Sequence, residues 1–342
     1  MKLYYEIYGC TLKLEFQNDL LLLEHLKNHV GKIVEQDDAE NTDASIIFKK
    51  SSAFDLEKMY EHFVFDTKRN VFVEPTCEQA IVGYSNNDGT IVHFYNEYYL
   101  VVFYLEKKEV VFNYSDNFFN IDYLLMEFFK YCIFPIKMTD GWLPLHSSCV
   151  LSKKTGKTIL FVGDSGCGKS SNALLMSLNF NYYFCNDEVT YLTYNDGKFL
   201  VNPTGDKVKI CQEMYSSLLE KNIEFVAAQL ESEFVCDVSS MRRNDYNFSK
   251  EHNLPIDIIF FLKRDDSKCN IQIYQPDVIE KYRCLIENCN MSVWTNREHK
   301  RMIMNMVDKI IKEVNILSFI YPTNEINNIS NKIEEKYDEY NN

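Results

Sequence analysis

The sequence lacks the patterns that define disulfide-rich, zinc-binding and membrane-spanning proteins. Its 11 cysteines form no Cys-x-x-Cys pair, and the two nearest, Cys284 and Cys289, are five residues apart. Because zinc sites and disulfide frameworks both need regular spacing, we expect free, mostly buried thiols in a reducing compartment. No apolar run approaches the roughly 18–20 residues of a membrane span, and the N-terminal stretch has no signal-peptide core. These features predict a cytoplasmic protein.

Positive charge is also scarce. Lys and Arg number 36 against 50 Asp and Glu, which gives a net charge of −14. Nucleic acids and anionic membranes both attract basic surfaces, so the sequence predicts neither as a partner. The 46% apolar and 25% charged residues are those of a globular protein, and 342 residues suffice for one large domain or two ordinary ones.

The first part of the chain, residues 1–140, predicts an α+β domain whose role the sequence does not identify, substrate recognition being one candidate. The expected elements are strands over 2–8 and 11–16, a helix from Asn18 or Asp19 to Val30, an antiparallel meander over 70–114 with a turn at Asn87-Asp88-Gly89, and a helix from Asp116 to Phe134 closed by Pro135.

The second part, residues 141–342, predicts an α/β domain with a mixed sheet. The expected elements are a strand over 158–162, a helix from near Lys169, a strand ending near Asn186, a hairpin about Asn195-Asp196-Gly197, a buried strand over 257–263, and helices over 296–314 and 324–337 with a strand between them.

A glycine-rich segment links the first of these strands to the first helix. Gly163-Asp164-Ser165-Gly166-Cys167-Gly168-Lys169-Ser170 matches the P-loop pattern G-x-x-x-x-G-K-[ST]. Glycines let backbone N–H groups converge on a phosphate, and the helix start adds positive potential. Together with Ser171, the segment predicts a nucleotide site, with Lys169 on the β- and γ-phosphates and Ser170 on Mg²⁺. We expect ATP, although GTP is not excluded.

The alternative to a P-loop is a glycine-rich turn that matches by chance. The apolar strand before the segment and the apolar-periodic helix after it favour the P-loop, because phosphate binding requires that context. Within the loop, Cys167 is expected to act as a small filler that contributes its backbone N–H. An exposed, electropositive setting there would lower the pKa of its thiol.

Acidic residues follow at the end of the next predicted strand. Asp187 comes 18 residues after Lys169, which leaves room for one helix and one strand. P-loop enzymes place a magnesium-binding carboxylate at such a position, so Asp187 and Ser170 form the predicted metal site. An ordinary strand-end aspartate is the alternative.

The stretch LHSSCVLSKKTGKTILFVGDSGCGKSSNALLMSLNFNYYFCNDEVTYL resembles the core of the HPr kinase-like P-loop proteins, relatives of PEP carboxykinase. That pattern is a His before a small-residue strand, a GDSGxGKS loop, a helix, and a strand ending in paired Asp. The resemblance covers about residues 142–200. It implies an α/β domain of this type and an ATP- and Mg²⁺-dependent kinase. The implied catalytic residues are Lys169, Asp187 and His146, with Glu188 as a further candidate. A structural histidine and a solvated strand-end glutamate are the alternatives for His146 and Glu188.

The resemblance also implies the partners, a nucleotide and a hydroxyl acceptor in a protein, a peptide or a small molecule; self-association stays open. The later HPr kinase motif with its Glu and Arg is missing, so HPr is not the expected acceptor. A carboxykinase-like lyase is less favoured, because nothing obvious supplies a second metal and an oxaloacetate site.

One position departs from this family pattern. Asn186 stands where the first Asp of the pair is expected, and an amide does not accept a proton near pH 7. Either Asp187 serves both metal and base, or Glu188 or His146 supplies the base, or turnover is weak. The last alternative describes a nucleotide-binding switch or accessory protein with little kinase activity.

Two pairs of cations are further candidates for contacting a transferred phosphoryl group. Arg242 and Arg243 lie in a polar stretch, and Lys263 and Arg264 end the predicted strand over 257–263. A guanidinium or ammonium there would neutralise charge on the phosphates. Solvated surface cations are the alternative for both pairs.

Overall fold

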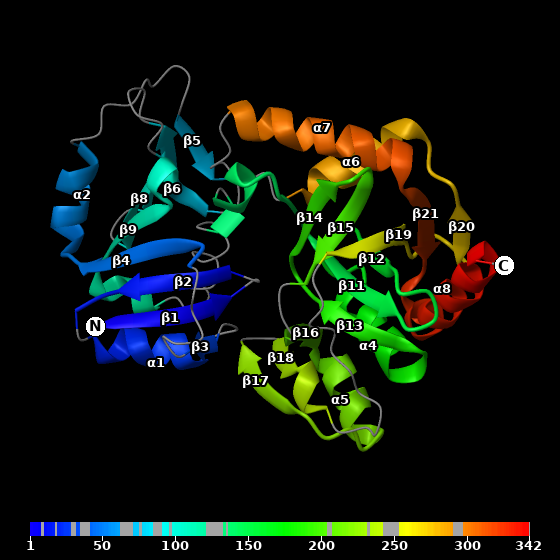
Figure 1. The fold of residues 1–342 in the computed structure, drawn as a ribbon. Coiled ribbons are helices and arrows are strands. Elements are labelled where there is room, and N and C mark those ends of the chain that lie inside the picture. The colour runs from blue at the N-terminus through cyan, green and yellow to red at the C-terminus, as the bar shows by residue number, and fades with distance from the viewer. Residues whose placement is uncertain are drawn as a thin grey trace. The chain divides into compact units, whose positions relative to one another are not determined.

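The computed structural model describes residues 1–7, 10–17, 19–28, 32–34, 42–61, 71–74, 77–84, 91–95, 98–120, 133–134, 136–203, 207–230, 233–241, 253–289 and 297–341. The chain divides into two compact units, one made of Met1–Asp140 with Met291–Lys300 and the other of Gly141–Asn290 with Arg301–Asn342 (Figure 1). The functional assignment of the two predicted domains, 1–140 and 141–342, stays a prediction.

The first unit is built on a mixed sheet with the order β3-β1-β2-β4-β9-β8-β7-β6-β5 among the described residues. Its strands are β1 (Lys2–Ile7), β2 (Cys10–Glu15), β3 (Lys32–Val34), β4 (Ala44–Lys50), β5 (Val71–Glu74), β6 (Cys77–Tyr84), β7 (Ile91–Tyr95), β8 (Tyr99–Tyr104) and β9 (Glu109–Tyr114). Strand β4 runs parallel to β2 and β9, and β5 to β9 form the predicted antiparallel meander.

Helices α1 (Leu20–Asn28) and α2 (Ala53–Glu61) pack against this sheet, α1 at β3 and α2 at β8 and β9. Asp19 caps α1, because its Oδ1 accepts hydrogen bonds from the N–H groups of Leu21 and Leu22 at 3.0 and 3.1 Å. The other predicted cap, Asn18, lies outside the described residues, as do the turn over 87–89 and most of the predicted helix over 116–134. The described start of that helix, η3 (Asp116–Asn120), is a 3₁₀ rather than an α-helix.

The second unit centres on a sheet with the order β10-β14-β15-β19-β12-β11-β13, to which β21 adds beside β19 and β20 beside β21. Its strands are β10 (Leu143–Leu145), β11 (Ser147–Ser152), β12 (Thr158–Val162), β13 (Tyr182–Asn186), β14 (Thr190–Asn195), β15 (Lys198–Asn202), β19 (Leu254–Arg264), β20 (Gln272–Tyr274) and β21 (Asn315–Tyr321). Strands β12, β19 and β21 are parallel, so their carboxyl ends meet at one edge.

The helices of this unit are α4 (Lys169–Asn179), α5 (Gln212–Glu220), α6 (Val278–Asn288), α7 (Arg297–Glu313), which begins in the first unit, and α8 (Ile326–Asn341), with the short helices η4 (Val238–Ser240) and η5 (Thr323–Glu325). The hairpin β14–β15, the buried strand β19 and the order α7-β21-α8 confirm the sequence predictions. A three-stranded sheet, β16 (Lys207–Cys211), β18 (Glu233–Asp237) and β17 (Val226–Leu230), was not predicted.

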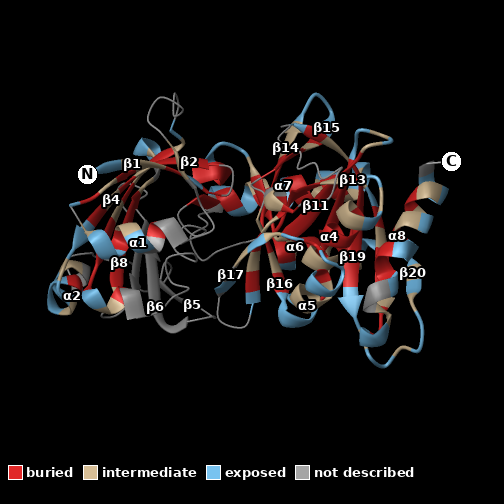
Figure 2. Ribbon diagram, turned by 90° about the horizontal axis from the view of Figure 1, so that it is seen from below, coloured by how far each residue is buried: buried red, intermediate tan, exposed pale blue. Residues whose placement is uncertain are grey.

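The core of the second unit lies between the central strands and α4. Ile159 and Phe161 of β12, Leu174 of α4 and Phe260 of β19 are all fully buried, and Figure 2 shows β11, α4 and β19 largely in the buried class. Strand β12, buried throughout, and β19, largely buried, match the apolar runs that the sequence shows. This core fixes the loop that follows β12.

In the described part of the chain no helix is both long and apolar enough to cross a membrane. The cysteines in that part are free thiols.

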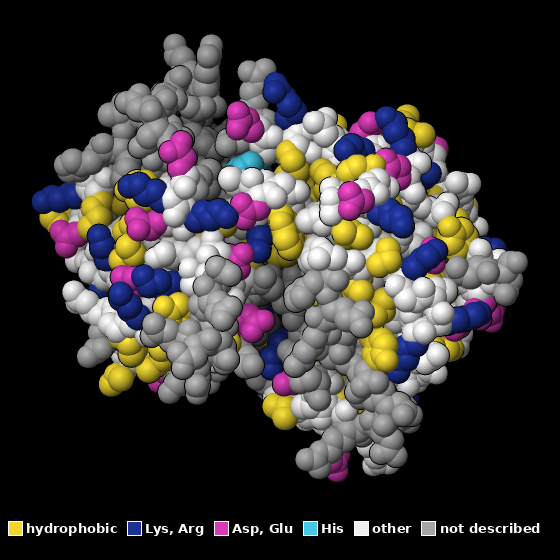
Figure 3. Space-filling model, viewed as in Figure 1, with side chains coloured by type: hydrophobic (Ala, Val, Ile, Leu, Met, Phe, Trp, Pro, Cys, Tyr) yellow, Lys and Arg dark blue, Asp and Glu magenta, His cyan; other side chains and the backbone are white. Residues whose placement is uncertain are grey.

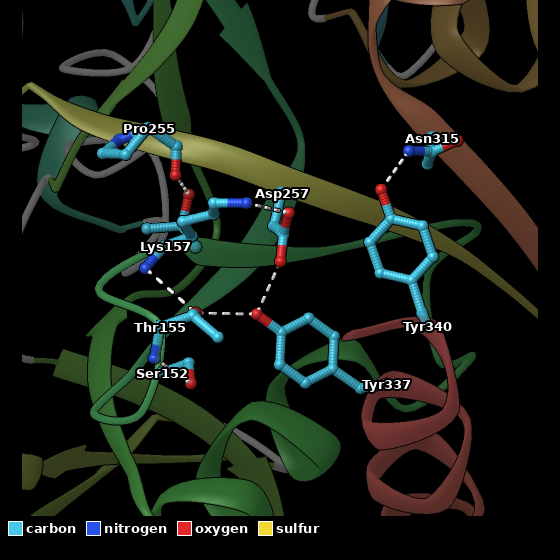
Figure 4. Close-up of polar contacts among 9 residues, drawn as sticks. Ser152, Thr155, Lys157, Pro255, Asp257, Asn315, Tyr337 and Tyr340 are labelled. Carbon is cyan, nitrogen blue, oxygen red and sulfur yellow. Dashed lines mark hydrogen bonds and ion pairs between the residues drawn. The ribbon is translucent and has the colours of Figure 1, made fainter. Parts of the chain in front are cut away.

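A buried polar cluster joins α8 to the amino-terminal ends of the parallel strands β12 and β19 (Figure 4). The Tyr337 hydroxyl donates to Oδ2 of Asp257 at 2.7 Å and lies 2.9 Å from Oγ1 of Thr155. Lys157 pairs with Oδ1 of Asp257 at 3.0 Å. Because Asp257 is buried, each of these hydrogen bonds replaces lost hydration and anchors the C-terminal helix.

Replacing Tyr337 by phenylalanine is expected to lower the free energy of unfolding by about 2 kcal/mol, because one oxygen of the buried Asp257 loses its partner. Tyr340→Phe is the matched control on the same helix: its hydroxyl also has a partner, Asn315, but its side chain is 43% exposed (Figure 4). That change should cost about 0.5 kcal/mol or less. Urea denaturation measures both, and equal losses would contradict the anchoring role of the cluster.

Candidate functional site

The predicted P-loop, residues 163–171, lies at the junction of β12 and α4, with the strand before it and the helix after it as expected. Gly163 is required by a close approach, because a Cβ there would lie 2.2 Å from the carbonyl oxygen of Leu262 in β19. Gly168 precedes α4 with a left-handed backbone, φ 88°, and offers no side chain to cap the helix. The first turn of α4 also contains no acidic residue. Its N–H groups therefore keep their capacity to bind an anion.

Lys169 begins α4, and its side chain lies across the start of the glycine loop (residues 163–170). Its ammonium donates to the carbonyl oxygens of Gly163 and Asp164 at 2.8 and 3.0 Å. The residue is only 6% exposed, and no described carboxylate forms a salt bridge with it. An ammonium that contacts only carbonyl oxygens among the described residues is available to bind an incoming anion.

Asp187 lies at the point where three elements meet. Its Oδ1 accepts hydrogen bonds from Ser170 of α4 at 2.8 Å and from Ser148 of β11 at 2.5 Å, and its Oδ2 accepts from the backbone N–H of Lys209 in β16 at 3.0 Å. Burial raises the pKa of the Asp187 carboxyl, the charge of Glu188 raises it further, and the hydrogen bonds oppose both effects. The predicted metal pair, Ser170 and Asp187, is thus in direct contact.

Glu188 follows with a left-handed backbone, φ 68°, an unusual conformation for a residue with a side chain. Its carboxylate forms an ion pair with the Lys209 ammonium at 3.5 Å, and the Lys209 side chain is 14% exposed. Sequence reasoning missed Lys209, because it belongs to no motif and its strand was not predicted. The signal available was the alternation of Lys207-Val208-Lys209-Ile210 beyond the hairpin.

Asn186 is fully buried, and its side chain forms hydrogen bonds within the turn and not with the elements that contact Asp187. Its amide Nδ2 donates to the carbonyl oxygen of Val189 at 3.1 Å and to Oγ1 of Thr190 at 2.7 Å. The Thr190 hydroxyl also accepts a hydrogen bond from Ser147 at 2.6 Å. Within the described residues, the buried Oδ1 of Asn186 has no hydrogen-bond partner. The amide therefore stabilises the turn between β13 and β14.

Asn186→Asp is expected to destabilise the fold by about 2 kcal/mol or more at neutral pH, because a carboxylate cannot donate and would face a buried carbonyl oxygen. Since burial raises the pKa of such a carboxyl, the loss should grow as pH rises and vanish well below the ordinary value of about 3.9. Asn181→Asp, on an exposed residue beside β13, is the control. Denaturation across pH measures both, and an Asn186→Asp protein of unchanged stability with faster transfer would contradict this prediction.

The remaining candidate residues are a histidine and two pairs of cations, and they lie in different settings. His146 lies half-buried between β10 and β11, and its backbone N–H donates to the carbonyl oxygen of Asn288 at 2.7 Å; its catalytic role stays a prediction. Lys263 and Arg264 are exposed at the end of β19, next to the close contact of Leu262 with the loop. Arg242 and Arg243 lie outside the described residues.

Cys167 is buried like the small filler that the sequence predicts, but its thiol lies in a different setting from the exposed one considered there. The residue is buried at 3% exposure, and burial raises the pKa of its thiol although Lys169 acts in the opposite direction. Its carbonyl oxygen accepts a hydrogen bond from the hydroxyl of Tyr321 at the end of β21. The expectation of an exposed thiol with a lowered pKa is wrong, because β21 and the core cover this part of the loop.

The donor set at Ser170 and Asp187 fits magnesium. One hydroxyl and one carboxylate oxygen are the protein ligands that Mg²⁺ takes alongside phosphate oxygens and water. Among the described residues no group of three or more His, Cys, Asp or Glu side chains could hold a metal ion. A metal at this pair would complete its coordination with nucleotide and water.

On the surface, Figure 3 shows basic and acidic side chains interspersed over the described part of one face.

No protein-family model matches the sequence, and no curated protein matches it either. Among solved structures, the HPr(Ser) kinase/phosphatase from Coxiella burnetii is similar to this chain, with 10% identity and a TM-score of 0.28. The similarity covers 58% of this chain and 94% of that one.

Proposed function

We propose that this chain is a P-loop kinase of the HPr kinase/PEP carboxykinase type, which transfers the γ-phosphoryl group of Mg·ATP to a hydroxyl. The observation that carries the proposal is the contact of Ser170 with Asp187 at 2.8 Å, beside an uncapped helix start and a lysine without a carboxylate partner among the described residues. These are the parts that bind phosphates and their metal in P-loop proteins.

Each residue has a distinct task in this proposal. Backbone N–H groups of the glycine loop bind the phosphates. The Lys169 ammonium leaves its hydrogen bonds with two loop carbonyl oxygens and binds the β- and γ-phosphates instead. Ser170 and Asp187 hold Mg²⁺, which when bound neutralises phosphate charge. Because Asp187 is already engaged by three donors, Glu188 and His146 remain alternative bases for the acceptor hydroxyl.

A second candidate is a nucleotide-binding switch with little turnover. The observation that favours it is the burial of Asn186 in the turn before β14, where the family pattern places a carboxylate. The two candidates share the nucleotide site and differ only in transfer. The test is equilibrium binding of ATP to the full chain in Mg²⁺ and in EDTA, followed by incubation with γ-labelled and α-labelled ATP and candidate acceptors. Label transfer from γ-labelled ATP alone supports the kinase, binding without transfer supports the switch, and the absence of Mg²⁺-dependent binding contradicts both.

Lys209 offers a sharper test of the carboxylate pair. Lys209→Met keeps the backbone N–H that contacts Asp187 but removes the ammonium beside Glu188. The pKa of Asp187 should rise further, and affinity for Mg·ATP should fall by about tenfold. Lys207→Met, two residues away on the same strand, removes an ammonium that pairs with Asp237 and serves as the control. Equal effects of the two changes on nucleotide binding would show that Lys209 has no special place at the site.

A further inference from the structure

A cavity of about 250 Å³ opens at the carboxyl ends of the parallel strands β12, β19 and β21. Its wall includes Asp164, Lys263, Tyr274, Arg283, Cys284 and Glu287. Ligands of open α/β sheets bind at this edge. The volume lies below the roughly 300–1,000 Å³ of pockets for drug-sized molecules, so the cavity suits a smaller one.

The cavity adjoins the start of the glycine loop, where the Lys169 ammonium is held. Gly163 and Asp164 line it, and the same two residues hold the Lys169 ammonium through their carbonyl oxygens. In P-loops this lysine contacts the β- and γ-phosphates. A molecule in the cavity would therefore lie beside the phosphoryl group that the proposed reaction transfers.

The cavity wall carries exposed charged side chains of both signs. Lys263 and Arg283 form no salt bridge with a described residue, and neither do Asp164 and Glu287. Glu280 differs, because its Oε1 accepts hydrogen bonds from the Tyr274 hydroxyl at 2.6 Å and from Ser318 at 3.4 Å. Cations and carboxylates that are both unpaired favour a ligand that carries both charges.

We propose that this cavity binds the phosphoryl acceptor, and that the acceptor is a small zwitterion, an amino acid with a hydroxyl side chain. The inference rests on the proposed kinase function. Lys263 and Arg283 bind the carboxylate of the amino acid, Glu287 binds its ammonium, and its hydroxyl points to the loop. The hydroxyl oxygen forms a bond to the γ-phosphorus while the bond from that phosphorus to the β–γ bridging oxygen breaks. The electron pair leaves with ADP, and the hydroxyl proton passes to the base of the proposed reaction, Glu188 or His146.

The first test uses the full chain with Mg·ATP and either L-serine, L-threonine or L-homoserine. Glycerol, D-glycerate and ethanolamine lack one or both charges and serve as comparators. Phosphorus NMR detects the phosphorylated product, and calorimetry without nucleotide measures binding of each compound. At least one amino acid should bind and react with kcat/KM at least about tenfold above every comparator. If no amino acid reacts, or the comparators react equally well, the proposal is overturned.

The second test changes the cavity itself. Arg283→Gln removes a cation, and Cys284→Phe fills space; each should weaken amino-acid binding by at least about tenfold while ATP affinity stays within about twofold. Lys281→Gln on the same helix and Cys269→Phe at an exposed position are controls outside the wall. Undiminished amino-acid binding in both cavity variants overturns this inference and leaves the nucleotide site intact. Failure of the proposed kinase function gives a separate result, because the parent protein itself would then fail to bind Mg·ATP.

Discussion

A Lys169→Ala protein is expected to bind Mg·ATP at least about 100-fold more weakly than the parent and to lose about 10³-fold or more in turnover. The change removes the one side-chain cation that the P-loop motif supplies, and the ammonium has no described carboxylate partner to release. The loss should be larger in turnover than in binding, since negative charge on the transferring phosphoryl oxygens is stabilised mainly in the transition state.

The fold should tolerate this change, because Lys169 contacts only two loop carbonyls through hydrogen bonds. Lys154→Ala, which removes an exposed ion pair with Asp338, is the control for losing one lysine. Titration with a fluorescent ATP analogue and an ADP-release assay measure binding and turnover. A Lys169→Ala protein that binds and hydrolyses ATP like the parent would show that the glycine loop is not a P-loop.

Asp187→Asn is expected to abolish the Mg²⁺ dependence of ATP binding and reduce phosphoryl transfer at least about 100-fold, because an amide is a poor magnesium ligand. The same protein should be at least as stable as the parent in EDTA. An asparagine oxygen can still accept from the Lys209 N–H, while its amide donates to the hydroxyls of Ser148 and Ser170.

The pH dependence separates this result from a general loss of structure. The pKa of Asp187 is raised in the folded state, so that state holds the proton more tightly than the unfolded chain. The parent therefore loses stability from this group as pH rises above the ordinary pKa of about 3.9, and Asp187→Asn does not. The stability of the variant relative to the parent should increase from acid to neutral pH. An unchanged Mg²⁺ dependence would disprove the metal assignment, and Asp187→Ala should repeat the functional loss.

The parts of this site that lie close together in the sequence could be predicted from it. The strand before Gly163, the loop and the helix from Lys169 follow from apolar periodicity and glycine spacing within one short segment. Asp187 comes one helix and one strand later, and that short connection places it near Ser170. Asp19 likewise caps its helix through local hydrogen bonds.

The remaining features depend on contacts between distant segments. Cys167 is buried because β21, which carries Tyr321, packs over the loop from 154 residues away in the chain. Lys209 reaches Asp187 through a strand whose sequence signal is one short alternation and whose partner strand, β18, lies further along the chain. The role of Asn186 is different, because its partners, the carbonyl of Val189 and the hydroxyl of Thr190, are local in the sequence; a motif alignment by residue type still cannot show it.

The hydrogen bond from the Lys209 amide to Asp187 joins a single backbone proton to the charge of the buried carboxylate. The chemical shift of that proton depends on whether the oxygen opposite it is ionised, protonated or coordinated. One resonance in a nitrogen-edited NMR spectrum therefore reports the state of the carboxylate directly. Titrating this signal with acid, magnesium or nucleotide follows the site in the intact, ¹⁵N-labelled chain, with no chemical probe attached to it.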